Sequence, residues 1–205
     1  MVRRFLLTAA TLAVAVSVAA QSPQGWKVRV DRSQSAQDPD NTPSLVFKPM
    51  GKGLHVKGGP AGTFWNGTMA SGSYTLKATF NLQEPSNHTN YYGLVFGGSN
   101  LEAPTQAYVY FVIAQNGTFL VRQRQGEMVS DVVNRQSNAA VRQPAANGQS
   151  SNTLEVRVTG TTVSYAVNGT VVHSGPKGGL KTDGLVGVRV NHVLDVQFEG
   201  FEVGK

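Results

Sequence analysis

The 205-residue chain contains no cysteine. Disulfide bonds, thiolate chemistry and cysteine-ligated metal sites are therefore excluded, and the fold has to be stabilised by its core alone. Charged residues make up only 15% of the chain, and the formal net charge of +6 comes from lysines and arginines that are scattered along it. Because nucleic-acid binding proteins usually cluster their positive charge, no nucleic-acid partner is expected.

The sequence motifs of several enzyme classes are also missing. The histidines lie in separate segments, without a pair at the spacing of metal ligands, at positions His55, His88, His173 and His192. The chain has neither a Gly-x-Ser-x-Gly turn nor a glycine-rich phosphate loop. An active site would have to assemble in three dimensions from residues that are distant in the sequence.

The longest apolar run lies at the start of the chain, where Phe5–Ala20 follows the basic residues Arg3 and Arg4. The run has about 16 residues, fewer than the roughly 20 that span a bilayer. Small residues at 18–20 precede Gln21, as at a signal peptidase cleavage site. We therefore predict a signal peptide at 1–20 and an exported mature chain, periplasmic or extracellular, without a membrane anchor; a retained anchor is the alternative. No cysteine follows the cleavage site, so the chain is not a lipoprotein.

Residues 21–205 show the period of β-strands from end to end. In Ser73–Leu82 the even-numbered residues are apolar and the odd-numbered ones are polar, which is typical of a half-buried strand. Similar runs occur at Trp26–Val30, Leu45–Phe47, Leu54–Val56, Tyr91–Phe96, Ala107–Ala114, Thr118–Arg124, Leu154–Val158, Thr162–Val167, Val171–His173, Leu185–Val190 and Leu194–Val203. No stretch has a convincing helical period, so an all-β protein is predicted.

Four Asn-Gly pairs mark turns, at positions 66–67, 116–117, 147–148 and 168–169. Asn-Gly tolerates the positive φ angles of tight hairpin turns, and the pairs at 116–117 and 168–169 each divide two strong strands. Two polar segments are expected to be loops, Glu84–Asn90 and the longer Asn134–Asn152, which is either functional or mobile. About a dozen short strands without internal repeats predict a single domain over 21–205, built as a two-sheet antiparallel jelly-roll sandwich.

A series of short segments resembles the concanavalin A-like lectin/glucanase superfamily. They span nearly all of the mature chain, at Ser71–Leu76, Tyr92–Gly97, Tyr108–Phe111, Asn116–Arg122, Asn152–Val156, Val167–Gly169, Gly184–Gly187 and Val196–Phe198. Within the superfamily the chain looks most like the domain of bacterial secreted family-sixteen-related and 3-keto-disaccharide-hydrolase-like proteins. The resemblance implies a concanavalin A-like sandwich, but the segments are mostly structural and say little about activity.

The resemblance also implies where catalytic acids would lie. Retaining glucanases of this superfamily carry Glu-x-Asp-x-Glu on one strand, so that two carboxyl groups flank the glycosidic bond. The nearest match here is Asp195-Val196-Gln197-Phe198-Glu199, in which Gln197 replaces the middle acid. This segment is predicted to be a solvated strand face, and the hydrolytic mechanism does not carry over.

Side-chain alternation predicts a surface of tyrosines and arginines. In the hairpin around 116–117, Tyr108 and Tyr110 have the opposite parity to the apolar residues of their strand, and Arg122 and Arg124 have the opposite parity to those of the partner strand. Arg189 alternates in the same way with valines. If these strands share a sheet, the five side chains line one surface. Aromatic rings stack on the apolar faces of sugars, and arginine donates hydrogen bonds to hydroxyls or to a uronate carboxylate.

Three further residues are candidates for this surface: Trp65, Tyr91 and His192. For Trp65, a place in the core is the alternative. For the whole surface, the alternative is that the tyrosines fill or flank the sandwich core and that the arginines are merely solvated.

A loop at Asp38, Asp40 and Asn41 gathers oxygen ligands of the kind that calcium prefers. We note it as a candidate structural calcium site, and an acidic turn without an ion is the alternative. No cofactor is required by any motif in the chain.

The sequence thus favours a secreted domain that binds a poly- or oligosaccharide on its Tyr/Arg surface. A glycoside hydrolase or a polysaccharide lyase acting in the same cleft is the alternative, because a lyase would use Tyr and His for proton transfer while Arg neutralises a uronate. A structural envelope or adhesion module is a third reading. The sequence leaves the oligomeric state and the identity of the sugar open.

Overall fold

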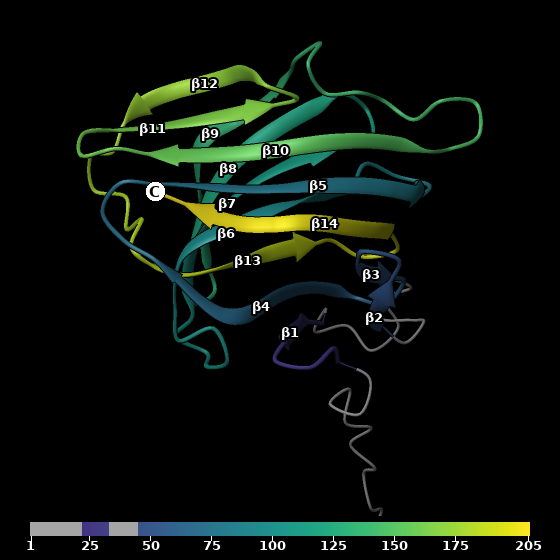
Figure 1. Cartoon of the computed structure of the whole chain (residues 1–205), viewed down its shortest axis with the longest axis horizontal. Coiled ribbons are helices and arrows are strands. Elements are labelled where there is room, and N and C mark those ends of the chain that lie inside the picture. Colours follow the sequence, from purple (N-terminus) through teal and green to yellow (C-terminus); the bar gives the residue numbers. More distant parts are fainter. Residues whose placement is uncertain (1–21, 33–44) are drawn as a thin grey trace, which may run out of the picture.

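The computed structural model describes residues 22–32 and 45–205, in which fourteen strands form two antiparallel sheets of seven strands each. Sheet 1 has the order β1 (Lys27–Asp31), β4 (Ala61–Ala70), β13 (Gly184–Val190), β6 (Tyr91–Ser99), β7 (Ala107–Ala114), β8 (Thr118–Gln125) and β9 (Met128–Ser137). Sheet 2 has the order β12 (Thr170–Pro176), β11 (Thr162–Val167), β10 (Ser150–Val158), β5 (Tyr74–Glu84), β14 (Asp195–Gly204), β3 (Gly53–Lys57) and β2 (Val46–Met50). In Figure 1 the strands β10, β5 and β14 of sheet 2 cross in front of β6, β7 and β8 of sheet 1, so the predicted all-β, two-sheet sandwich is confirmed.

The alternation seen in the sequence places the core between the sheets. The even-numbered residues of β5, from Tyr74 to Leu82, are buried and the odd-numbered ones are partly exposed. On β14, Phe198 is 1% exposed and packs on Phe80 of β5 and Phe47 of β2 at centroid distances of 6.2 and 6.5 Å. Trp26, which precedes β1, contacts Phe198 edge-on at 5.4 Å and so closes this end of the core.

Two of the Asn-Gly pairs form the predicted hairpins. Asn168 and Gly169 both have positive φ, 51° and 81°, between β11 and β12. Between β7 and β8 Gly117 has a φ of 80°, and Asn116 accepts hydrogen bonds from the backbone and the hydroxyl of Thr118. Both hairpin predictions are confirmed.

The sequence prediction missed two strands of sheet 1. β4 contains Asn66-Gly67, which forms a bulge within the strand and not the predicted turn. Leu185 pairs with Met69 and Gly187 with Trp65, so β4 carries extra residues here. β9 was missed because it is a polar edge strand, exposed along most of its length. The predicted loop at 134–152 was therefore too long at both ends, since β9 continues to Ser137 and β10 begins at Ser150.

The shortened segment between β9 and β10 is held by two buried or half-buried amides. Asn152, fully buried on β10, accepts a hydrogen bond from the backbone N–H of Arg142 and donates one to its carbonyl, at 2.8 and 3.0 Å. Asn168 donates to the carbonyl of Ala140 at 2.8 Å. These hydrogen bonds anchor the segment to β10 and to the turn between β11 and β12 of sheet 2.

Sheet 1 buries side chains on both of its faces, and this positions the candidate site. Its inner face belongs to the core between the sheets, whereas a second apolar cluster lies on its outer face. That second cluster consists of Trp65, Val95, Leu101, Tyr108, Tyr110, Val112 and Leu120, with Tyr91 and Leu185 packed at its edge. Within residues 22–32 and 45–205 there is no helix of the length and apolarity needed to cross a membrane.

Candidate functional site

The outer face of sheet 1 gathers the predicted tyrosines and arginines. In the β7–β8 register Tyr108 lies opposite Arg124 and Tyr110 lies opposite Arg122. Arg189 on β13 reaches the same face, where its Cζ lies 5.5 Å from the centroid of the Tyr110 ring. The alternation of the strands therefore places all five side chains on one surface, as the sequence predicted.

The aromatic residues of this surface are less exposed than an open stacking platform would require. Tyr108 is 2% exposed and Trp65 is 3% exposed, because both pack into the second apolar cluster with Leu101 from the segment between β6 and β7. Trp65 is thus buried, but on the outer face of sheet 1 and not between the sheets. Tyr110 and Tyr91 line a cavity, whereas Tyr108 is buried with its hydroxyl group bonded to Arg189.

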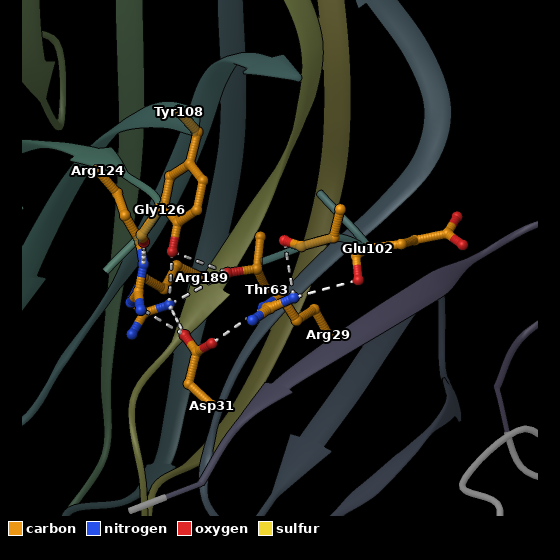
Figure 2. A network of polar contacts seen from close by, with 9 residues as sticks. Arg29, Asp31, Thr63, Glu102, Tyr108, Arg124, Gly126 and Arg189 are labelled. Atoms are coloured by element: carbon orange, nitrogen blue, oxygen red, sulfur yellow. Dashed lines mark hydrogen bonds and ion pairs between the residues drawn. The ribbon is translucent and has the colours of Figure 1, made fainter. Parts of the chain in front are cut away.

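A carboxylate that the sequence did not single out organises the arginines. Asp31, at the end of β1, forms ion pairs with Arg189 at 2.8 Å, Arg29 at 3.3 Å and Arg124 at 3.5 Å. Figure 2 shows its carboxylate facing the three guanidinium groups, which come from three different strands. The signal for Asp31 is the continued alternation of Lys27–Asp31, which puts Arg29 and Asp31 on the same face of the edge strand.

Arg189 is the most enclosed of these arginines. Its side chain is 10% exposed, and Nη1 donates hydrogen bonds to Asp31, to the Thr63 hydroxyl at 3.1 Å and to the Tyr108 hydroxyl at 3.0 Å. The strand neighbour of Arg189 on β6 is Gly93, which in turn pairs with Val112 on β7. The buried hydroxyl of Tyr108 therefore serves to hold the arginine in place.

The charges of this cluster shift the pKa of its members. Burial alone would raise the pKa of the Asp31 carboxyl, but the charge and hydrogen bond of Arg189, together with the charges of Arg124 and Arg29, outweigh burial and lower the pKa below its usual 3.8. Burial would lower the pKa of Arg189, yet Tyr108 and Asp31 outweigh it and raise that pKa. The ion pair is therefore fully charged at neutral pH.

The lowered pKa of Asp31 predicts an acid-sensitive stability. Because the folded-state pKa lies below the unfolded-state pKa, the cluster contributes its full stabilisation above about pH 3.8 and loses it as the pH falls through the folded-state pKa. Urea unfolding across the acidic range should show a steeper loss of unfolding free energy in the wild type than in Asp31→Asn. Parallel pH profiles for the two proteins would contradict this assignment.

Two neighbouring cavities open on this face. One, of about 230 Å³, is lined by Tyr91, Tyr110, Val112, Leu120, Arg122, Arg124, Val129, Arg189 and Asn191. The other, of about 370 Å³, is lined by Arg29, Val30, Asp31, Arg32, Pro104, Gln106, Arg124, Gly126 and Glu127. Arg124 lines both, so the two cavities adjoin there. The first combines aromatic rings, aliphatic side chains and three guanidinium groups, which is the composition of a small polar ligand site.

His192 does not line these cavities. It lies after β13, where its Nε2 is 2.9 Å from Nε2 of His88 in the loop between β5 and β6. At that distance the two rings are within hydrogen-bond reach of each other. Sequence reasoning missed this pair because its members are 104 residues apart. No group of three or more His, Asp or Glu residues suited to a metal ion occurs in the part of the chain that the structure describes.

The segment that matches the glucanase motif is on the other side of the molecule. Asp195 lies on β14 of sheet 2, where its carboxylate contacts His55 at 2.6 Å and Lys57 at 2.7 Å. Gln197 donates a hydrogen bond to the carbonyl of Met50. The prediction of a solvated face is wrong for Asp195, which is only 8% exposed. Its carboxylate is already paired with His55 and Lys57. The predicted calcium ligands Asp38, Asp40 and Asn41 lie outside the described residues.

Solved structures share this fold. The carbohydrate-binding module CBM66 from Bacillus subtilis matches with a TM-score of 0.65 and 10% identity, over 88% of this chain and 96% of its own. A Bacillus subtilis protein of unknown function with a galectin-like fold matches with a TM-score of 0.62 and 13% identity, over 92% and 91% of the two chains. The chain has the concanavalin A-like fold. A GH16 protein from a Bacteroides ovatus mixed linkage glucan PUL, in complex with a G4G4G3G product, also matches this chain, with a TM-score of 0.57, 6% identity and coverage of 86% and 93%.

The sequence resemblance to the concanavalin A-like superfamily is confirmed at the level of the fold. No protein-family model and no curated protein matches the sequence of this chain. At identities of 6–13%, the structural neighbours carry the fold and no residue roles.

Proposed function

We propose that the chain is an exported carbohydrate-binding domain that holds a poly- or oligosaccharide in the cavity between Tyr91, Tyr110 and the three arginines Arg122, Arg124 and Arg189. The observation that carries the proposal is the composition of this cavity, in which ring faces and guanidinium groups meet at one place. Tyrosine rings pack against the apolar faces of pyranoses, and guanidinium groups donate hydrogen bonds to sugar oxygens. With about 230 Å³, the cavity is smaller than the roughly 300–1,000 Å³ of a drug-sized site, so it suits one sugar unit of a longer chain.

Two further observations support binding. The fold is shared with a carbohydrate-binding module, and two of the cavity's arginines, Arg124 and Arg189, are held by Asp31 before any ligand arrives. A preorganised site loses less conformational entropy on binding than a flexible one. The acidic segment of the glucanase motif lies on sheet 2, and its Asp195 is bound to His55 and Lys57, so it supplies no catalytic pair to this cavity.

A glycan array probed with the full-length protein tests the proposal. Arg122→Met is expected to weaken binding to the glycans that the wild type captures by about 10-fold or more, since a charged hydrogen bond is worth about 1.5–3 kcal/mol. Arg122 is chosen because its side chain is 41% exposed and its removal spares the buried cluster.

Arg157→Met is the matched control. Arg157 lies on β10 of sheet 2, is 61% exposed and is paired with Glu155, much as Arg122 is paired with Asp131. It should bind like the wild type. If the protein binds no glycan, or if both variants lose affinity equally, the proposal is wrong. If the protein cleaves the glycans and so releases new chain ends, a hydrolase or lyase is favoured instead.

A further inference from the structure

The arginine cluster on the outer face of sheet 1 has more positive charge than its own carboxylate can compensate. One carboxylate, that of Asp31, forms the ion pairs with Arg29, Arg124 and Arg189. Three guanidinium charges thus share a single negative charge. Because Asp31 and Arg189 are only 14% and 10% exposed at their side chains, water screens this excess less than it would on an open surface.

The three arginines that line the smaller cavity also keep hydrogen-bond donors to spare. A guanidinium group carries five N–H donors. Arg189 uses Nη1 for its three contacts, and Arg124 uses Nε for the carbonyl of Gly126 and Nη1 for Asp31. Arg122 uses Nε for Asp131, at 2.5 Å. Counting partners among the described residues, each of these three guanidinium groups therefore has donors left over, and all three line the cavity.

Apolar side chains lie beside these hydrogen-bond donors in the same cavity. Val112 and Leu120 line the same cavity as Tyr110, so a ligand meets an apolar wall next to the guanidinium groups. A free inorganic anion would use the donors and leave this wall in contact with water. A sugar ring that carries an anionic group would use both, with its ring on the wall and its anion on the arginines.

We propose that the preferred ligand of this cavity is an acidic saccharide, in which a uronate carboxylate is bound by Arg122, Arg124 and Arg189. This inference rests on the proposed carbohydrate binding and narrows its substrate class. A carboxylate is planar and matches the fork of a guanidinium group, and its negative charge compensates the excess positive charge of the cluster. A sulfated sugar would supply the same charge with a different shape, so the test separates the two.

The test uses hexasaccharides of galacturonate, mannuronate and glucuronate. Each is paired with its carboxyl-reduced counterpart, in which the same backbone carries a primary alcohol. Calorimetric titration of the full-length protein should give an affinity about 10- to 100-fold higher for at least one uronate than for its reduced counterpart. A sulfated form of the reduced sugar should bind more weakly than the uronate.

A gain-of-affinity variant sharpens the test. In Asp131→Asn the guanidinium group of Arg122 loses its exposed carboxylate partner, so the affinity for the uronate should rise roughly two- to five-fold. Glu155→Gln on sheet 2 makes the same change of net charge beside Arg157 and should leave the affinity unchanged. In Arg122→Met the preference for the uronate over its reduced counterpart should fall by about 10-fold.

The outcomes separate this inference from the function on which it rests. Equal affinity for uronates and reduced sugars, or equal losses for both in Arg122→Met, would overturn the acidic ligand and keep carbohydrate binding. A sulfated sugar that binds as tightly as the uronate would overturn the carboxylate assignment, and an equal gain in Glu155→Gln would show that net charge alone drives binding. If no member of either series binds and the glycan array is also negative, both proposals fail.

Discussion

The variant Asp31→Ala is expected to lose about 3–5 kcal/mol of unfolding free energy, the usual cost of leaving a buried charge without its partner. Arg189 would keep its hydrogen bonds to Thr63 and Tyr108 but would be buried without a carboxylate, next to two further guanidinium groups. In a domain of this size such a loss lowers the midpoint of thermal unfolding by about 6–20 °C. Differential scanning calorimetry measures it.

A second acidic residue on the same sheet provides the control for this prediction. Asp131 is paired with Arg122, but both side chains are 41% exposed, so Asp131→Ala should cost no more than about 1 kcal/mol. The double variant Asp31→Ala/Arg189→Met should recover part of the loss, because it removes the unpaired charge. Equal destabilisation by Asp31→Ala and Asp131→Ala would show that Asp31 does not organise the cluster.

The variant Phe198→Ala is expected to cost about 3–5 kcal/mol, through lost burial and the cavity that remains. Phe198 is 1% exposed and its ring meets Phe80, Phe47 and Trp26, which belong to or precede three different strands. Close packing on several elements prevents the site from collapsing into the vacated space. Urea unfolding followed by tryptophan fluorescence measures the loss.

Phe201→Ala is the matched control, because Phe201 lies on the same strand, contacts Trp26 at 5.6 Å and is only partly buried. Its replacement should cost clearly less than that of Phe198. A similar cost for both would mean that the packing around Phe198 relaxes, and that the sandwich core is less rigid at this end than its ring contacts indicate.

The fold could be predicted from the sequence wherever alternation was strong. The pattern of β5 placed every even-numbered residue correctly, and the parity of β7 and β8 separated the core face from the Tyr/Arg face. β4 and β9 were missed for physical reasons: a bulge at Asn66-Gly67 breaks the alternation of β4, and the edge strand β9 buries little.

The composition of the site was predictable only in part. Parity tells which face a side chain occupies but not how deeply neighbouring segments cover it, and so the sequence left open whether Tyr108 is exposed or, as the structure has it, buried in a cluster with Leu101. Asp31 and Arg29 reach the site from β1, which pairs with β4, a strand that the sequence did not reveal. The contact between His88 and His192 likewise depends on two loops whose proximity follows from strand order alone.

Because one carboxylate pairs with three guanidinium groups, related chains can replace the residues of this cluster only in a certain order. Arg29 or Arg124 can be exchanged first, since the remaining arginines still have a partner in Asp31. Replacement of Asp31 before Arg189 would leave the buried guanidinium group of Arg189 without a carboxylate partner. Descendants that abandon this cluster are thus expected to have lost its arginines first and its aspartate last.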